Sequence, residues 1–145
     1  LLESGVTPCG LGCRDTLRLE AGMHLYGSEM DNTTTPYEAS LGWIVNSTKE
    51  YIGKNILDNQ KKNGIDKKLV ALKLTKRNIA RHDYPIMNED IVIGKVTSGT
   101  WSPSLSVPIA LAYVPTELSK VGSVVNVKIR GKLEAATVVK KPFYC

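Results

Sequence analysis

Six short runs of apolar residues, divided by glycine, proline and other turn-forming residues, occupy the sequence after residue 66. Hardly any helical pattern lies between them, so each run is predicted to be a strand. The runs cover residues 69–74, 84–87, 91–97, 109–114, 124–129 and 133–139. Arg130, Gly131 and Lys132 between the last two runs form a hairpin signal. Short strands separated by glycine, proline and other turn-forming residues indicate a small antiparallel barrel or sandwich.

The first third of the chain has a helical pattern instead. Residues 10–21 contain no proline and consist mainly of tolerable to good helix formers. Gly22 suits the left-handed conformation that commonly ends a helix. Thr35, Pro36 and Glu38 then form a capping box, which predicts the start of a second, short helix.

Two more elements and a boundary follow from the pattern. Residues 43–45 are predicted to begin an apolar strand, and residues 54–62 a helix that Gly64 stops. After Gly64 the pattern of apolar residues changes from helical to strand-like. We therefore divide the chain into residues 1–66 and 67–145, which makes it an α+β protein. Because the first part is small and its helices are interrupted, we expect it to complete a larger unit rather than to form a hydrophobic core of its own.

Two arginines on the first predicted helix pose an electrostatic question. Arg14 and Arg18 are spaced i, i+4, and such a like-charge pair is unfavourable by a few tenths of a kcal/mol unless an anion lies nearby. Asp15 shares their side of the helix and can neutralise one of them. We therefore expect another group to face the second arginine.

The length and composition of the chain are typical of a globular domain. The chain has 145 residues, which fits one domain, with 42% hydrophobic and 23% charged residues. Residues 1–5 lack a basic or long apolar segment, so we expect no signal peptide, and prolines interrupt the uncharged stretch 96–116, so we expect no membrane span. Three cysteines are too few and too odd in number for a disulfide framework, so we expect buried free thiols and a reducing compartment, the cytoplasm or the mitochondrial matrix.

The net charge of +5 favours an anionic partner, either an acidic protein or a polyglutamylated ligand, although an ordinary solvated basic surface explains it as well. Nucleic acid is a poor third choice, because the lysines are scattered and aromatic residues make up only 6% of the chain.

The residues also carry a family resemblance. The string from Gly10 to Met23 resembles the T-protein of the glycine cleavage system, an aminomethyltransferase. Further segments match in the family's order along the whole chain, at residues 25–27, 34–36, 41–43, 52–54, 96–100, 102–105, 109–114, 129–132 and 142–144. The resemblance covers only the C-terminal part of the family's length.

The resemblance implies a fold and an activity. Residues 1–66 are expected to complete a folate-binding module, and residues 67–145 to form a six-stranded Greek-key β-barrel. The implied reaction passes an aminomethyl group from the lipoyl arm of a carrier, the H-protein, to tetrahydrofolate, which gives ammonia and 5,10-methylenetetrahydrofolate. The catalytic carboxylates of the family are expected upstream of Leu1, in a missing N-terminal half, so we assign no catalytic residue here; we expect no metal, nucleic acid or membrane.

Three residues are candidates for folate contacts by this resemblance. Arg14 occupies the position of the family's folate-contacting arginine, and a guanidinium fork suits a carboxylate or a pterin edge; its alternative role is an ion pair with Asp15. Trp43 offers a flat apolar wall, or is simply a core residue. Tyr144 lies in a C-terminal tail that, in the family, folds back towards the folate site. Its alternative role is side-chain packing alone. We expect His24 and His82 to be structural.

Two other functions stay open at this point. One is another folate-dependent enzyme of the same fold, such as a demethylase or the folate domain of a sarcosine or dimethylglycine dehydrogenase. The other is a non-enzymatic β-barrel module with a helical lead-in that binds a partner or nucleic acid.

Overall fold

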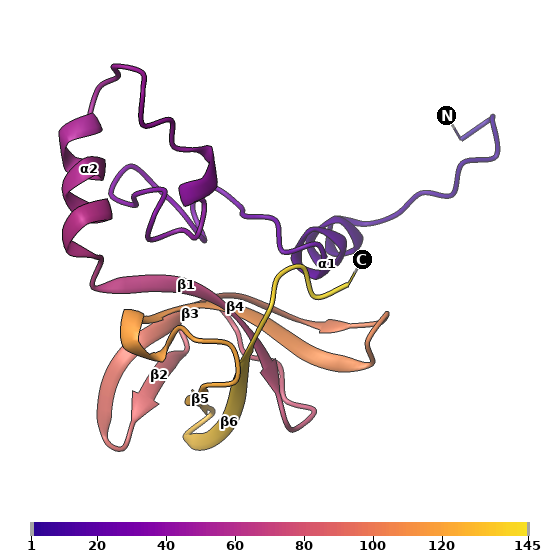
Figure 1. Cartoon of the computed structure of the whole chain (residues 1–145). Coiled ribbons are helices and arrows are strands. Elements are labelled where there is room, and N and C mark those ends of the chain that lie inside the picture. The colour runs from indigo at the N-terminus through magenta and orange to yellow at the C-terminus, as the bar shows by residue number, and fades with distance from the viewer. Residues whose placement is uncertain (1, 145) are drawn as a thin grey trace.

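Six antiparallel strands close into a barrel in the computed structural model of the chain, which describes residues 2–144 (Figure 1). The strands are β1 (Lys67–Leu74), β2 (Pro85–Asn88), β3 (Ile91–Ser102), β4 (Val107–Pro115), β5 (Val124–Ile129) and β6 (Lys132–Val139). Their order around the barrel is β1-β4-β3-β2-β5-β6, and β6 pairs again with β1. Because β1 lies beside β4, at the end of the β2–β3–β4 meander, the barrel contains a Greek key. The prediction of a six-stranded antiparallel barrel is confirmed.

Strand β1 is apolar on both faces because it is covered on both faces. Val70, Leu72 and Leu74 belong to the cluster of buried side chains that includes residues of all six strands. The alternate positions, Leu69 and Ala71, belong to a second buried cluster with residues of β4 and with a leucine of the first helix. The first cluster fills the barrel, and the second attaches the N-terminal segment to the barrel's outer surface.

The hairpin predicted at Arg130 and Gly131 joins β5 to β6. Both residues have positive φ, 48° and 83°, as a two-residue turn between twisted strands requires. Gly131 adopts this conformation freely, whereas Arg130 is held in it against the steric preference of a residue with a Cβ atom.

The helices are α1 (Leu11–Glu20), η1 (Gly42–Ile44), α2 (Lys54–Asn63) and η2 (Thr116–Leu118). The two predicted helices at 10–21 and 54–62 are therefore present, and α1 lies against the barrel next to the C-terminal tail (Figure 1). Among residues 2–144, no helix has the length and apolar character needed to cross a bilayer.

Two local predictions in the N-terminal third are wrong. Residues 43–45 do not begin a strand: the amide of Ile44 donates to Leu41, which makes a 3₁₀ turn, and no neighbouring strand is there to pair with it. The capping box does form, with Oε2 of Glu38 accepting from the Thr35 amide at 2.9 Å, but it caps a single turn rather than a helix. Ser40, with φ of 59°, ends that turn.

Candidate functional site

Helix α1 ends in a glycine motif that sets the course of the chain beyond it. Gly22 has φ of 69°, its amide donates to the carbonyl of Leu19 at 2.8 Å, and the amide of Met23 donates to the carbonyl of Arg18 at 2.8 Å. This is the Schellman arrangement, which satisfies carbonyls that the helix end leaves free. It brings Met23 and the following residues back along the end of α1.

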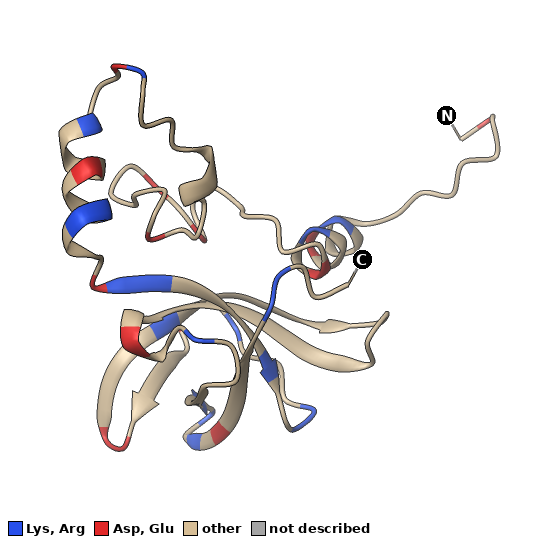
Figure 2. Cartoon of the chain, viewed as in Figure 1, with Lys and Arg blue, Asp and Glu red and all other residues tan. Residues whose placement is uncertain are grey.

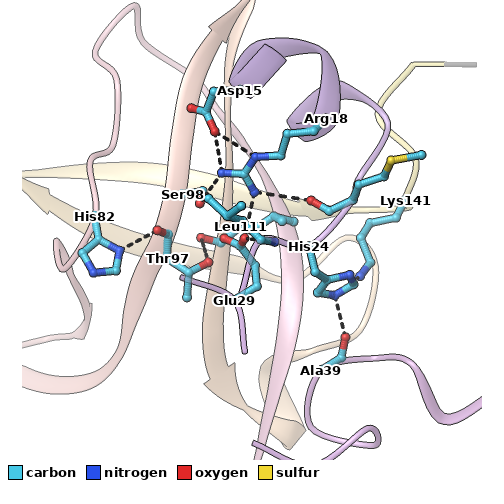
Figure 3. Close-up of polar contacts among 12 residues, drawn as sticks. Asp15, Arg18, His24, Glu29, Ala39, His82, Thr97, Ser98, Leu111 and Lys141 are labelled. Carbon is cyan, nitrogen blue, oxygen red and sulfur yellow. Dashed lines mark hydrogen bonds and ion pairs between the residues drawn. The ribbon is translucent and has the colours of Figure 1, made fainter. Parts of the chain in front are cut away.

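Arg18 is the polar centre of this region (Figure 3). Its guanidinium lies 2.7 Å from Oδ1 of Asp15 and 2.7 Å from Oε2 of Glu29, and it donates to Oγ of Ser98 at 2.8 Å. The side chain of Glu29 is fully buried, and that of Arg18 is only 10% exposed. One arginine thus fastens α1 to the 25–30 loop and to β3.

This arrangement decides the role of the two helix arginines. Asp15 and Glu29 both pair with Arg18, so the second acidic group faces the same arginine and not Arg14, contrary to our expectation. Arg14 is exposed and takes part in no ion pair within residues 2–144. Its alternative role as a structural ion pair with Asp15 is excluded, and its guanidinium remains available to a ligand.

Two pockets meet at the end of α1. The first, of about 580 Å³, is lined by Arg14, with Leu17, Ala21 and Met23 among its apolar walls. The second, of about 600 Å³, shares Ala21 and Met23 with the first and is lined on its other side by Trp43. The side chain of Trp43 is 83% exposed within residues 2–144. Arg14 and Trp43 therefore face two adjoining hollows separated by the Ala21–Met23 segment.

Tyr144 lies near this region but lines neither pocket. The amides of Phe143 and Tyr144 both donate to the carbonyl of Glu20, at 2.9 and 3.1 Å, so the C-terminal tail folds back onto the end of α1. The side chain of Tyr144 is 54% exposed. The tail has the predicted course, and the phenol has no described contact that fixes its role.

The carboxylate of Glu20 is buried and serves the structure. Ser102 and Ser104 donate their hydroxyls to it, and the Ser104 amide adds a third hydrogen bond at 3.2 Å. The hydrogen bond from Ser102 is the main reason that the pKa of Glu20 lies below its usual value. Glu20 is therefore an ionised anchor between α1 and the β3–β4 turn.

His24 and Lys141 face each other beside the Trp43 pocket. Nε2 of His24 lies 2.8 Å from the carbonyl of Ala39, so that nitrogen carries the proton. Nζ of Lys141 is 3.5 Å from the same nitrogen, and two donors at this distance do not form a hydrogen bond. Burial, and then the charge of Lys141, lower the pKa of His24; burial likewise lowers the pKa of Lys141.

The remaining candidates are a second histidine, the cysteines and a possible metal site. Nδ1 of His82 contacts the carbonyl of Thr97 at 2.6 Å on the side of β3. Cys9 and Cys13 are free but exposed, so the expectation of buried thiols is wrong for these two residues. Within residues 2–144, no three His, Cys, Asp or Glu side chains come together as a metal site would require.

Comparison with known proteins identifies the family. Residues 67–144 match the family model described as the glycine cleavage T-protein C-terminal barrel domain, and residues 2–49 match the GCVT N-terminal domain. The chain belongs to the glycine cleavage T-protein family.

Other members of the T-protein family are similar over nearly the whole chain. An aminomethyltransferase of Synechococcus sp. (strain CC9311) is 58% identical, and one of Prochlorococcus marinus (strain SARG) is 59% identical, each over 99% of this chain. The crystal structure of glycine cleavage system aminomethyltransferase T from Bartonella henselae matches 97% of the chain with a TM-score of 0.90 at 34% identity. The chain spans about 40% of the length of these proteins.

Sequence reasoning missed the residues that connect the site. Glu29 holds Arg18 in place, but nothing in the 25–30 segment indicates a buried carboxylate, because its cation lies 11 positions earlier, on α1. Ala21 and Met23 join the two pockets, and in the sequence they look like ordinary helix-end residues. The only available signal was the unmatched i, i+4 arginine pair.

Proposed function

We propose that this chain is part of an aminomethyltransferase of the glycine cleavage system and supplies one wall of its tetrahydrofolate site. The relatives that are 58% and 59% identical over 99% of the chain bear the name aminomethyltransferase, which supports the activity. The observation that supports the site is the unpaired guanidinium of Arg14, whose neighbour Asp15 is taken by Arg18.

The residues present fit a flat, anionic ligand of folate size. Each of the two adjoining pockets falls within the range of about 300–1,000 Å³ that small-molecule sites occupy. Arg14 would offer a fork of donors to a carboxylate or to the pterin edge, and Trp43 a flat apolar wall. A contact from Tyr144 is proposed on weaker ground, the position of the tail beside Glu20.

The proposed reaction moves the aminomethyl carbon from a lipoyl arm to tetrahydrofolate, with release of ammonia and formation of 5,10-methylenetetrahydrofolate. Tetrahydrofolate, when bound, supplies the nitrogen that attacks the carbon. The role of this chain's residues is to bind and orient, which by itself contributes greatly to the rate of such transfers. We place no catalytic acid or base among them.

The proposed partner is an acidic lipoyl carrier, the H-protein of the same system. The net charge of +5 favours its approach by electrostatic steering. Two exposed free thiols fit a reducing compartment such as the cytoplasm.

A chimaera provides the test. This chain replaces the matching 40% of the Synechococcus aminomethyltransferase, and transfer from aminomethyl-lipoyl carrier to tetrahydrofolate is measured. We expect transfer in the chimaera, and a loss of about tenfold to a hundredfold in kcat/KM for Arg14→Ala, because one or two charge-assisted hydrogen bonds are removed. Arg14→Lys should recover only part of the loss.

Lys61→Ala is the matched control, since it removes an exposed positive charge from α2, away from both pockets. It should leave the rate unchanged. A folded chimaera without transfer activity would overturn the proposal, and so would an Arg14→Ala variant as active as its parent. Turnover of sarcosine or dimethylglycine without a lipoyl carrier would favour the demethylase alternative instead.

A further inference from the structure

A small pocket between the β1–β2 connection and the β5–β6 turn is surrounded by arginines. Its volume is about 210 Å³, and Arg77, Arg81 and Arg130 line it together with Asn78 and Tyr84. The volume corresponds to about seven water molecules, which suits a compact group and excludes a folate-sized one. This pocket is therefore separate from the site proposed above.

The barrel topology brings these arginines together. Arg77 and Arg81 lie on the connection between β1 and β2, whereas Arg130 lies in the β5–β6 turn. The two segments are neighbours because β1 pairs with β6 and β2 pairs with β5. Figure 2 shows both as positively charged segments at the lower end of the barrel.

The arginines have no negative partner. No Asp or Glu lines the pocket, and within residues 2–144 none of the three arginines takes part in an ion pair. Asp83, the acidic residue of the same connection, is engaged with Lys95 at 3.1 Å. All three arginines are exposed, and no acidic residue that lines the pocket balances their charge.

Surrounding contacts hold the pocket in shape. Asn78 donates its side-chain amide to Glu134, a carboxylate that is only 3% exposed, which fixes the β1–β2 connection from behind. The guanidinium of Arg77 lies 5.8 Å from the ring centre of Trp101, a cation–π contact that restricts its side chain. The amide of Tyr84 donates to the carbonyl of Arg81 at 3.2 Å.

Arg130 has an unusual backbone conformation for an arginine. The first position of this hairpin turn, with φ of 48°, is suited to Asn, Asp or Gly, and a long side chain there is disfavoured. Backbone strain of this kind persists where a side chain has a task. With the turn in this conformation, Arg130 lines the pocket together with Arg77 and Arg81.

We infer that this pocket binds a phosphate group. Arginine forks match phosphate oxygens with paired charge-assisted hydrogen bonds, and three of them around a cavity of this size can neutralise a compact multiply charged anion. The group could be carried by a free phosphate compound or by the headgroup of a lipid. The inference does not depend on the proposed transferase function.

The test is a titration of the chain with inorganic pyrophosphate at physiological ionic strength, followed by calorimetry and by the NMR signals of the arginine Nε–H groups. We expect saturable binding that shifts the signals of Arg77, Arg81 and Arg130. Arg77→Ala and Arg81→Ala should each weaken it by about tenfold. A parallel arm uses vesicles with and without phosphatidic acid, which distinguishes a free phosphate from a lipid source.

Arg130→Gly separates binding from structure. Glycine relieves the positive φ, so this variant should melt no earlier than the parent while it loses binding. The double variant Lys61→Ala/Lys62→Ala removes two exposed charges on α2 and should bind normally. Binding that is absent in both arms, or equally weakened by the α2 double variant, would overturn the inference.

Discussion

Arg18 and Glu29 form a buried ion pair, with Nη1 of the arginine 2.7 Å from Oε2 of the glutamate. The glutamate also accepts a hydrogen bond from the amide of Leu25 at 2.9 Å, which closes its own loop. The pair therefore holds a loop in shape and attaches it to α1 with the same carboxylate. Arg14, one turn earlier on the helix, lacks Asp15 as a partner because Asp15 pairs with Arg18.

The first prediction concerns this pair. Arg18→Met should lower the free energy of unfolding by about 3–5 kcal/mol, because it leaves the carboxylate of Glu29 buried without its cation. Urea unfolding followed by circular dichroism measures the change. Arg14→Met is the matched control on the same helix face and should fall within about 0.5 kcal/mol of the parent. Equal effects of the two variants would show that the buried pair does not stabilise the fold.

The second prediction is an acid sensitivity that comes from Glu20. Hydrogen bonds, chiefly from Ser102, lower its pKa below 4.5, so the folded chain releases this proton more readily than the unfolded chain. Its contribution to stability is complete above pH 4.5 and is lost as the pH falls towards the lowered pKa of the folded state.

Denaturant midpoints measured across this pH range should fall less steeply in Glu20→Gln than in the parent. Glu117→Gln, which changes an exposed carboxylate, should keep the parent's pH dependence. If Glu20→Gln and the parent show identical slopes, the carboxylate is not the source of the acid sensitivity.

The third prediction concerns two glycines. A Cβ atom on Gly99 in β3 would lie 2.0 Å from the carbonyl oxygen of Ala80, so Gly99→Ala must displace backbone and should destabilise the fold by about 2–3 kcal/mol. A Cβ on Gly12 in α1 meets nothing within 4 Å, and Gly12→Ala should stabilise by up to about 1 kcal/mol. Thermal melts of the two variants should shift in opposite directions; a shift in the same direction contradicts the packing.

The fourth prediction concerns His24 and Lys141. The side chain of Lys141 lies beside Gly22, where an added Cβ atom would come within 3.4 Å of it. Lys141→Met keeps an aliphatic chain there and removes the charge, so the pKa of His24 should rise. Because the pKa of Lys141 is lowered, its charged form is disfavoured in the fold, and the variant should also be more stable at neutral pH. An NMR titration of the imidazole measures the first effect. Lys140→Met removes an exposed neighbouring charge and should leave the His24 titration nearly unchanged.

Local patterns predicted most of the barrel. Each strand is a short run bounded by turn residues, and the signal at Arg130 and Gly131 marks the hairpin where the structure has it. Such signals depend on residues within a few positions of one another. The prediction at Trp43 failed for the same reason, because an apolar run extends as a strand only if another strand pairs with it, and none does.

The site depended on contacts that no local pattern contains. The sequence shows that Arg14 and Arg18 compete for Asp15, but the outcome is decided by Glu29 and Ser98, which lie 11 and 80 positions from Arg18. The folate roles of Arg14, Trp43 and Tyr144 remain predictions that the chimaera can test.

The hydrogen bonds from Phe143 and Tyr144 to the carbonyl of Glu20 join positions that lie 123 and 124 residues apart in the sequence. Contacts of such long sequence separation form late in folding, because the entropic cost of closing the intervening loop comes before any contact repays it. Docking of the tail on the end of α1 is therefore expected to follow closure of the barrel.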